Sequence, residues 1–185
     1  MPRLPQSIEE ARAAWRWRGG SRPPFAVVPA DGQESVWDYP RPPALVSDAR
    51  RVVVRCDGAL LAETRRGLRL LETAHPPTWY LPLADVDRAA LRATGPLSFC
   101  EWKGEAVGFD VVVGTRTLRR QAWAYPRVID DAYIALTDAV AFYATGLDIT
   151  VDGAPVRPQA GGLYGGWITP ELVGPFKGEP GTSGW

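Results

Sequence analysis

The segment Cys100-Glu101-Trp102-Lys103 brings three chemically active side chains together. If this segment is extended, its side chains alternate across a sheet, so Glu101 and Lys103 share one face while Cys100 and Trp102 share the other. A carboxylate and an amine two residues apart can act as acid and base. They can also form a surface ion pair that contributes under ~1 kcal/mol, which is the simpler interpretation. Lys103 and Glu101 are therefore candidate catalytic residues.

Cys100 and His75 are the other two candidate catalytic residues. His75 is the one histidine of the chain and precedes Pro76-Pro77, a stiff segment that would hold its ring in place. Cys100 would serve as a nucleophile if a base such as His75 activated it. The simpler alternatives are a small buried apolar side chain for Cys100 and a histidine hydrogen-bonded to a loop for His75.

The sequence predicts no metal site and no cofactor. The chain has two cysteines, Cys56 and Cys100, and no Cys-x-x-Cys pair that would indicate structural zinc. Together with His75 they could supply three ligands, but their spacing is not that of a zinc site. Two cysteines also argue against a disulfide framework. The phosphate-binding Walker A and Rossmann fingerprints are absent from the sequence.

Aromatic residues are abundant, with 8 tryptophans in 185 residues. So many tryptophans suggest an aromatic-lined cleft that would hold a planar or cationic group by stacking and cation–π contact. A tryptophan-rich core explains the same composition. The candidate ligand-binding residues are Tyr80, Trp102, Trp123, Tyr125, Tyr164 and Trp167.

The region after residue 157 is rich in Gly and Pro, including Gly161-Gly162 and Gly165-Gly166. Successive backbone N–H groups in such loops can hold an anion, and Lys177 would add positive charge. The alternative, which we favour, is a tight arm that packs along the domain.

Composition and charge narrow the class of partner. The 21 basic residues equal the 21 acidic residues in number, whereas a nucleic-acid-binding protein usually has a basic excess. No segment approaches the ~20 apolar residues of a membrane span, and the N-terminus lacks the apolar core of a signal peptide. We therefore expect a cytoplasmic protein with a small-molecule partner, no nucleic acid and no membrane, and with a homodimer as an open alternative.

The pattern of apolar runs and turn residues predicts a mainly β fold with one N-terminal helix and short helical turns. Ser7 and Glu10 resemble a capping box that begins the helix, and Gly19-Gly20 would end it. Asp57-Gly58 and Asp152-Gly153 predict two-residue hairpin turns. Strands are expected over 51–56, 59–64, 78–81, 97–102, 106–113, 118–125, 140–143 and 147–151, with a short helix over 85–91 and an ambiguous stretch over 67–74. We divide the chain into an N-terminal helix and linker (1–34), a core domain (35–156) and a C-terminal arm (157–185).

Several segments together resemble the family called domain of unknown function 427. The matching blocks are residues 67–82 with Asp85-Val86, residues 100–106, residues 122–126, residues 140–143, and the C-terminal stretches 158–167 and 173–185. Many members have proline where this chain has Glu101, which makes Glu101 a weaker candidate than Lys103. The family is sometimes labelled nucleotidyltransferase-like, but the paired-Asp metal motif of such enzymes is absent here.

The resemblance implies a β-tent type of fold, in which two antiparallel sheets pack at an angle, and places a site in the cleft between them. Our first hypothesis is a small-molecule-binding site in that cleft, with catalysis left open. The second is a non-catalytic interaction or oligomerisation module that uses the Gly-rich arm and the N-terminal helix. A third is a thiol redox enzyme based on Cys100.

Overall fold

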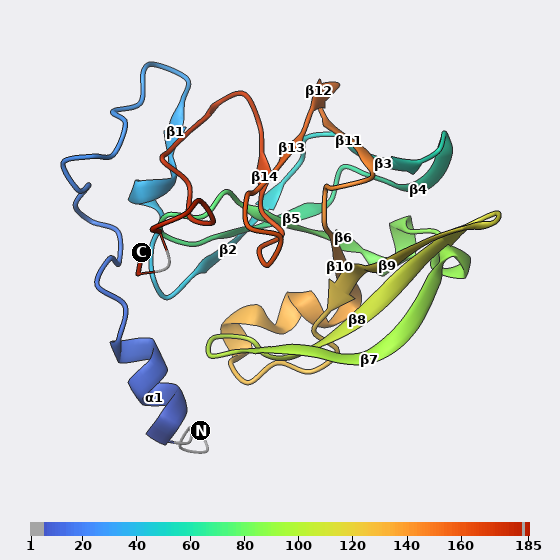
Figure 1. The fold of residues 1–185 in the computed structure, drawn as a ribbon, viewed down its shortest axis with the longest axis horizontal. Helices are drawn as coiled ribbons and strands as arrows, with labels where there is room; N and C mark the ends of the chain where they lie inside the picture. The colour runs from blue at the N-terminus through green and yellow to red at the C-terminus, as the bar shows by residue number, and fades with distance from the viewer. Residues whose placement is uncertain (1–5, 183) are drawn as a thin grey trace.

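The computed structural model describes residues 6–182 and 184–185, and its fold is mainly β, as predicted (Figure 1). The long strands are β2 (Ala44–Asp48), β3 (Val52–Cys56), β4 (Ala59–Thr64), β5 (Gly67–Leu71), β6 (Thr78–Pro82), β7 (Leu91–Cys100), β8 (Gly104–Val113), β9 (Arg116–Ala124), β10 (Ala139–Phe142) and β11 (Asp148–Val151). The two-residue strands are β1 (Glu34–Ser35), β12 (Ala154–Pro155), β13 (Arg157–Pro158), β14 (Trp167–Ile168) and β15 (Leu172–Val173). The helical elements are α1 (Gln6–Ala13), η1 (Val36–Asp38), η2 (Leu83–Asp85), η3 (Arg88–Ala90) and η4 (Asp131–Asp138).

Two antiparallel sheets form the body of the molecule. The larger has seven strands in the order β2-β5-β6-β10-β9-β8-β7, and the smaller has four in the order β12-β11-β3-β4. The seven-stranded sheet curls strongly, so that the long β7–β8 hairpin sweeps away from the four-stranded sheet (Figure 1). Two small pairs complete the fold: β13 with β14, and the parallel pair β1 with β15.

Both predicted Asp-Gly hairpins are confirmed. Asp57 and Gly58 have φ values of 48° and 82°, and Asp152 and Gly153 have 47° and 82°. Positive φ at both central residues is the requirement of a type I′ turn, whose twist matches that of the flanking strands. These turns join β3 to β4 and β11 to β12, which fixes the register of the smaller sheet.

The seven-stranded sheet has two apolar faces, and strand alternation decides which side chain lies on each. On β6, Trp79 and Leu81 pack in the main core with side chains of the four-stranded sheet, while Tyr80 belongs to a second cluster on the opposite face. On β9, Ala122 joins the main core and Trp123 the second cluster in the same way. On this second face the covering element is the short helix η4, which covers only part of the sheet.

The two flanking segments meet over a third cluster centred on Trp37. This side chain is fully buried, and its indole Nε1 donates to the Pro175 carbonyl at 2.9 Å. The parallel pairing of Glu34 with Leu172 lies beside it. The N-terminal segment and the C-terminal arm therefore hold each other against the domain.

Several predicted boundaries are wrong. Helix α1 begins at Gln6 and ends at Ala13, so Ser7 lies inside the helix and Gly19-Gly20 does not end it. Gly19 instead lies so close to the Tyr39 carbonyl oxygen that a Cβ would be 2.6 Å from it. The predicted helix over 85–91 is two separate 3₁₀ turns, η2 and η3. Asp85 accepts from the Thr64 hydroxyl of β4, and Asp87 caps η3 by accepting from the Ala89 backbone N–H, so a new turn begins at Asp87.

Other elements were ambiguous or missed. The stretch 67–74 forms β5, and β2 pairs with it along its whole length. Neither β2 nor η4 was predicted, because neither has clear alternation or a strong helical pattern. None of the helices in the described part of the chain is long and apolar enough to cross a membrane.

Candidate functional site

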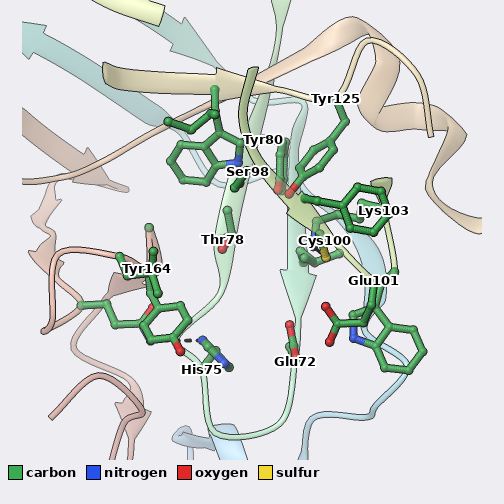
Figure 2. Close-up of a pocket in the computed structure, with 18 of the residues that line it drawn as sticks. Glu72, His75, Thr78, Tyr80, Ser98, Cys100, Glu101, Lys103, Tyr125 and Tyr164 are labelled. Carbon is green, nitrogen blue, oxygen red and sulfur yellow. Dashed lines mark hydrogen bonds between the residues drawn. The ribbon is translucent and has the colours of Figure 1, made fainter. Parts of the chain in front are cut away.

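A cavity of about 270 Å³ opens on the partly covered face of the seven-stranded sheet. Its walls come from β5, β6, β7, the turn after β7, the end of β9 and the C-terminal arm (Figure 2). The predicted position between the two sheets is wrong, because the space between them is filled by the main core. The cavity lies instead on the opposite face, where alternation places Thr78, Tyr80 and Trp123.

Nine of the ten candidate residues line this one cavity. They are His75, Tyr80, Cys100, Glu101, Trp102, Lys103, Trp123, Tyr125 and Tyr164. The tenth, Trp167, is fully buried in the main core, where it stacks on Trp79 with ring centroids 6.0 Å apart. Its indole Nε1 donates to the Phe142 carbonyl at 2.8 Å, so its polar group is already satisfied.

The turn between β7 and β8 positions Lys103. Strand β7 ends at Cys100, and Gly104 begins β8 with a φ of 102° that favours glycine. Alternation therefore does not extend through residues 101–103, and the predicted sharing of a face by Glu101 and Lys103 is wrong. The turn folds Lys103 back so that its Nζ lies 3.2 Å from Cys100 Sγ.

Lys103 is a buried cation. Only 5% of the residue is exposed, and Nζ lies 5.3 Å from the centre of the Tyr125 ring. Burial acts to lower the pKa of Lys103, but electrostatic interactions with Tyr80, Cys100 and Tyr125 outweigh it, and the pKa is raised well above 10.5. Burial also raises the pKa of Tyr80 to about 12, so its hydroxyl keeps its proton at neutral pH. The direction of this pKa shift favours the ammonium form of Lys103, which fits a cation better than a general base.

Two carboxylates face the same cavity (Figure 2). Glu101 Oε1 accepts from the indole Nε1 of Trp15 at 2.7 Å. Glu72 Oε1 accepts from Arg41 Nε at 3.0 Å. Sequence reasoning missed Glu72 as a site residue, since it follows directly after β5 in a segment that gave no clear strand or helix signal. Among the described residues, the Oε2 atom of each carboxylate has no hydrogen-bond partner.

The hydrogen bonds around His75 define its tautomer. Gln159 Oε1 accepts from the Gly166 backbone N–H, so Nε2 is the donor atom of this amide. Gln159 Nε2 then donates to His75 Nδ1, 3.1 Å away, and to the Lys177 carbonyl at 2.7 Å. His75 therefore accepts through Nδ1 and carries its proton on Nε2. It has no hydrogen bond to Cys100, whose polar neighbour is Lys103.

His75 should make the protein sensitive to mild acid. Burial, followed by the charges of Lys177 and Arg41, lowers the pKa of His75 from 6.5 to about 3. The unfolded chain therefore binds a proton below pH 6.5 that the folded protein does not, and stability falls as the pH drops from 6.5 toward 3. We expect a slope approaching about 1.4 kcal/mol per pH unit.

Urea denaturation at pH 7 and pH 5 measures this effect. Carboxylates also contribute to a change between these pH values. Because His75 is the one histidine of the chain, its contribution is the part of the difference that a His75 variant loses. A His75→Gln variant, which keeps an acceptor for Gln159, should lose most of the difference between the two pH values. An equal loss of stability in the variant would contradict the assignment.

The C-terminal arm closes one side of the cavity at Tyr164 and Gly165. A Cβ on Gly165 would lie 2.0 Å from the Trp123 ring, so only glycine permits this approach. The anion-holding loop remains a prediction. Lys177 donates to the Trp185 carbonyl and lies over the rings of Trp15 and Tyr164, at 4.1 and 5.8 Å from their centres. These contacts favour the tightly packed arm.

Comparison with known families matches residues 44–153 to the family described as domain of unknown function (DUF427). The chain belongs to this family. No curated protein matches the chain.

The DUF427 region supplies the cavity's charged groups, while its flanks supply part of the wall. Lys103, Glu72 and Glu101 lie within residues 44–153. The residues outside that range are Trp15, Gln159, Leu163, Tyr164 and Gly165. Of the wall residues not predicted, Thr78 could have been found from its alternation with Tyr80. Trp15 and Gln159 gave no such signal, because tertiary contacts bring them to the site.

The structure places the two cysteines and the histidine, the three ligands considered for zinc, in different parts of the fold. Cys56 is buried in the main core, while Cys100 and His75 line the cavity. In the part of the chain that the structure describes, no group of three or more His, Cys, Asp or Glu side chains could hold a metal ion.

Proposed function

We propose that this protein binds a small molecule in the cavity and that Lys103 holds an anionic or strongly electron-rich group of that molecule. One observation carries the proposal. The Lys103 ammonium is buried, yet within the described residues its one hydrogen-bond partner is the weak acceptor Cys100 Sγ. An ammonium has three donors, and buried charges are normally paired. A ligand would supply the missing acceptor.

The walls of the cavity favour a compact planar ligand. Tyr80 and Trp123 meet edge to face with ring centroids 6.3 Å apart. The ring centroids of Trp123 and Tyr143 are 4.5 Å apart. The Trp102 indole Nε1 is buried without a hydrogen-bond partner in the described structure. The volume of about 270 Å³ is near the lower end of the usual range for small-molecule sites.

The same geometry would support catalysis. A fixed ammonium stabilises negative charge that develops on a bound substrate, such as an oxyanion or an enolate. Cys100 is the candidate nucleophile beside it, and Glu101 or Glu72 is the candidate proton acceptor. His75 would act as a neutral donor through Nε2–H. Binding needs none of these steps, so binding is the first property to measure.

The test compares the two lysines of the chain, Lys103 and Lys177. The protein is screened by thermal shift against planar carboxylates and organic phosphates. A ligand at 100 times its Kd adds about 2.7 kcal/mol, which raises Tm by several degrees. Lys103→Met should weaken binding by roughly 10- to 100-fold and leave Tm without ligand unchanged or higher, since an unpaired buried charge is removed.

Lys177→Met is the matched control, because Lys177 is also buried but does not line the cavity. It should keep the affinity of the wild-type protein. The proposal fails if no anion shifts Tm, or if the hits bind Lys103→Met as tightly as wild type.

A further inference from the structure

We infer that the ligand is a zwitterion, with a cationic nitrogen for Glu101 and Glu72 in addition to the anionic group for Lys103. This inference rests on the proposed function. It begins from the charges that line the cavity. Three lining residues carry formally charged side chains, namely Lys103, Glu101 and Glu72. His75 is neutral because burial and nearby cations lower its pKa to about 3.

Two of these charges, of opposite sign, have no ionic partner among residues 6–182 and 184–185. Among the described residues, neither Lys103 nor Glu101 has an oppositely charged atom within the 4.0 Å of a salt bridge, and they do not pair with each other. In the part of the chain that the structure describes, the Glu101 carboxylate accepts one hydrogen bond, from the neutral Trp15 indole to Oε1. Glu101 and Lys103 lie two residues apart in one turn and do not pair with each other, which leaves both available to a third group.

Glu72 adds a second carboxylate to the negative side. Its side chain is 16% exposed, and Arg41, whose side chain is fully buried, binds one of its oxygens from behind. Figure 2 shows the carboxylates of Glu72 and Glu101 turned into the space that Cys100, Thr78 and Tyr164 border.

Two other cations lie behind the cavity wall and do not line the cavity. Arg41 and Lys177 both lie 4.1 Å from the ring centre of Trp15.

This charge pattern selects against ligands with a single sign. A pure anion that reaches Lys103 would also meet two carboxylates, and a pure cation held by the carboxylates would meet Lys103. Like charges brought together in a buried site reduce affinity. A molecule with an ammonium and a carboxylate joined by a planar body satisfies both ends. Amino acids and aminocarboxylates with an aromatic body form the chemical class that fits.

Three matched compounds test the inference at pH 7 by isothermal titration. They are 3-(aminomethyl)benzoate, which is a zwitterion, 3-methylbenzoate, which is an anion, and 3-methylbenzylamine, which is a cation. We expect the zwitterion to bind at least about 10-fold more tightly than either singly charged compound.

Variants separate the two ends of the site. Glu101→Gln should weaken binding of the zwitterion by about 10-fold, since it removes the attraction to the ammonium. The same variant should bind 3-methylbenzoate more tightly, since it removes the repulsion between two carboxylates. Lys103→Met should weaken binding of the zwitterion and tighten binding of 3-methylbenzylamine. The control is Glu105→Gln, which changes an exposed carboxylate of the same hairpin and should alter no affinity.

The outcomes distinguish this inference from the proposed function. If 3-methylbenzoate binds as tightly as the zwitterion and only Lys103→Met weakens it, the zwitterion is wrong and the anion-binding cavity stands. If all three compounds fail to bind up to about 10 mM, both are overturned. Equal binding of the zwitterion to wild type and to both cavity variants would also overturn both, because the ligand would then lie outside the cavity.

Discussion

Replacing Arg41 with methionine is expected to lower the free energy of unfolding by about 3–5 kcal/mol. The Arg41 side chain is fully buried and forms an ion pair with Glu72. It also donates to the carbonyls of Trp17 and Thr73 at 3.0 and 2.9 Å. One guanidinium thus joins the N-terminal segment to the chain after β5. Its loss leaves three acceptors without their donor.

Arg22→Met provides the control for this experiment. Arg22 forms a two-point ion pair with Asp38, but both side chains are substantially exposed, at 35% and 46%. Exposed pairs contribute little because water screens their charges, so this variant should unfold at almost the same urea concentration as wild type. Similar losses in the two variants would mean that burial does not decide the strength of these contacts.

Replacing Trp167 with alanine should also cost about 3–5 kcal/mol. The substitution leaves a cavity in the main core beside Trp79 and leaves the Phe142 carbonyl without its indole donor. Trp167→Phe fills most of the space, so we expect it to lower the free energy of unfolding by less. The unsatisfied Phe142 carbonyl should account for about 1–3 kcal/mol of that loss. Urea denaturation followed by circular dichroism measures both.

The control for Trp167 is Leu163→Ala on the same arm. Leu163 is 69% exposed, and its truncation should change stability by no more than about 0.5 kcal/mol. If Trp167→Ala were equally mild, the arm would contribute little to the folded state, and the packing of β14 over the main core would have to be reconsidered.

The parts of the fold that sequence predicts well are those set by neighbouring residues. An Asp-Gly pair between two apolar runs needs only its own backbone geometry to form a hairpin, and both such pairs do. Strand β2 depends instead on pairing with β5, and α1 ends at Ala13, before the Gly19-Gly20 pair that local sequence predicts as its end. Contacts made far along the chain decide these boundaries, and no local pattern reports them.

The candidate site was predictable in its residue types but not in its geometry. Reactive and aromatic side chains clustered in the family-like blocks, and nine of them meet in one cavity. The sequence could not show that Trp167 fills the core while Trp123 faces the cavity, because the face depends on register. It also could not show that a turn brings Lys103 to Cys100, since alternation assumes that the strand continues.

The parallel pairing of β1 with β15 has a consequence for biosynthesis. Strand β1 leaves the ribosome long before its partner β15, because the residues between them are made first. At about 5–20 residues per second, the interval is on the order of ten seconds. During that time Trp37 and its aromatic neighbours lack the C-terminal half of their cover. The nascent chain therefore passes through a period in which chaperone binding or self-association competes with completion of the fold.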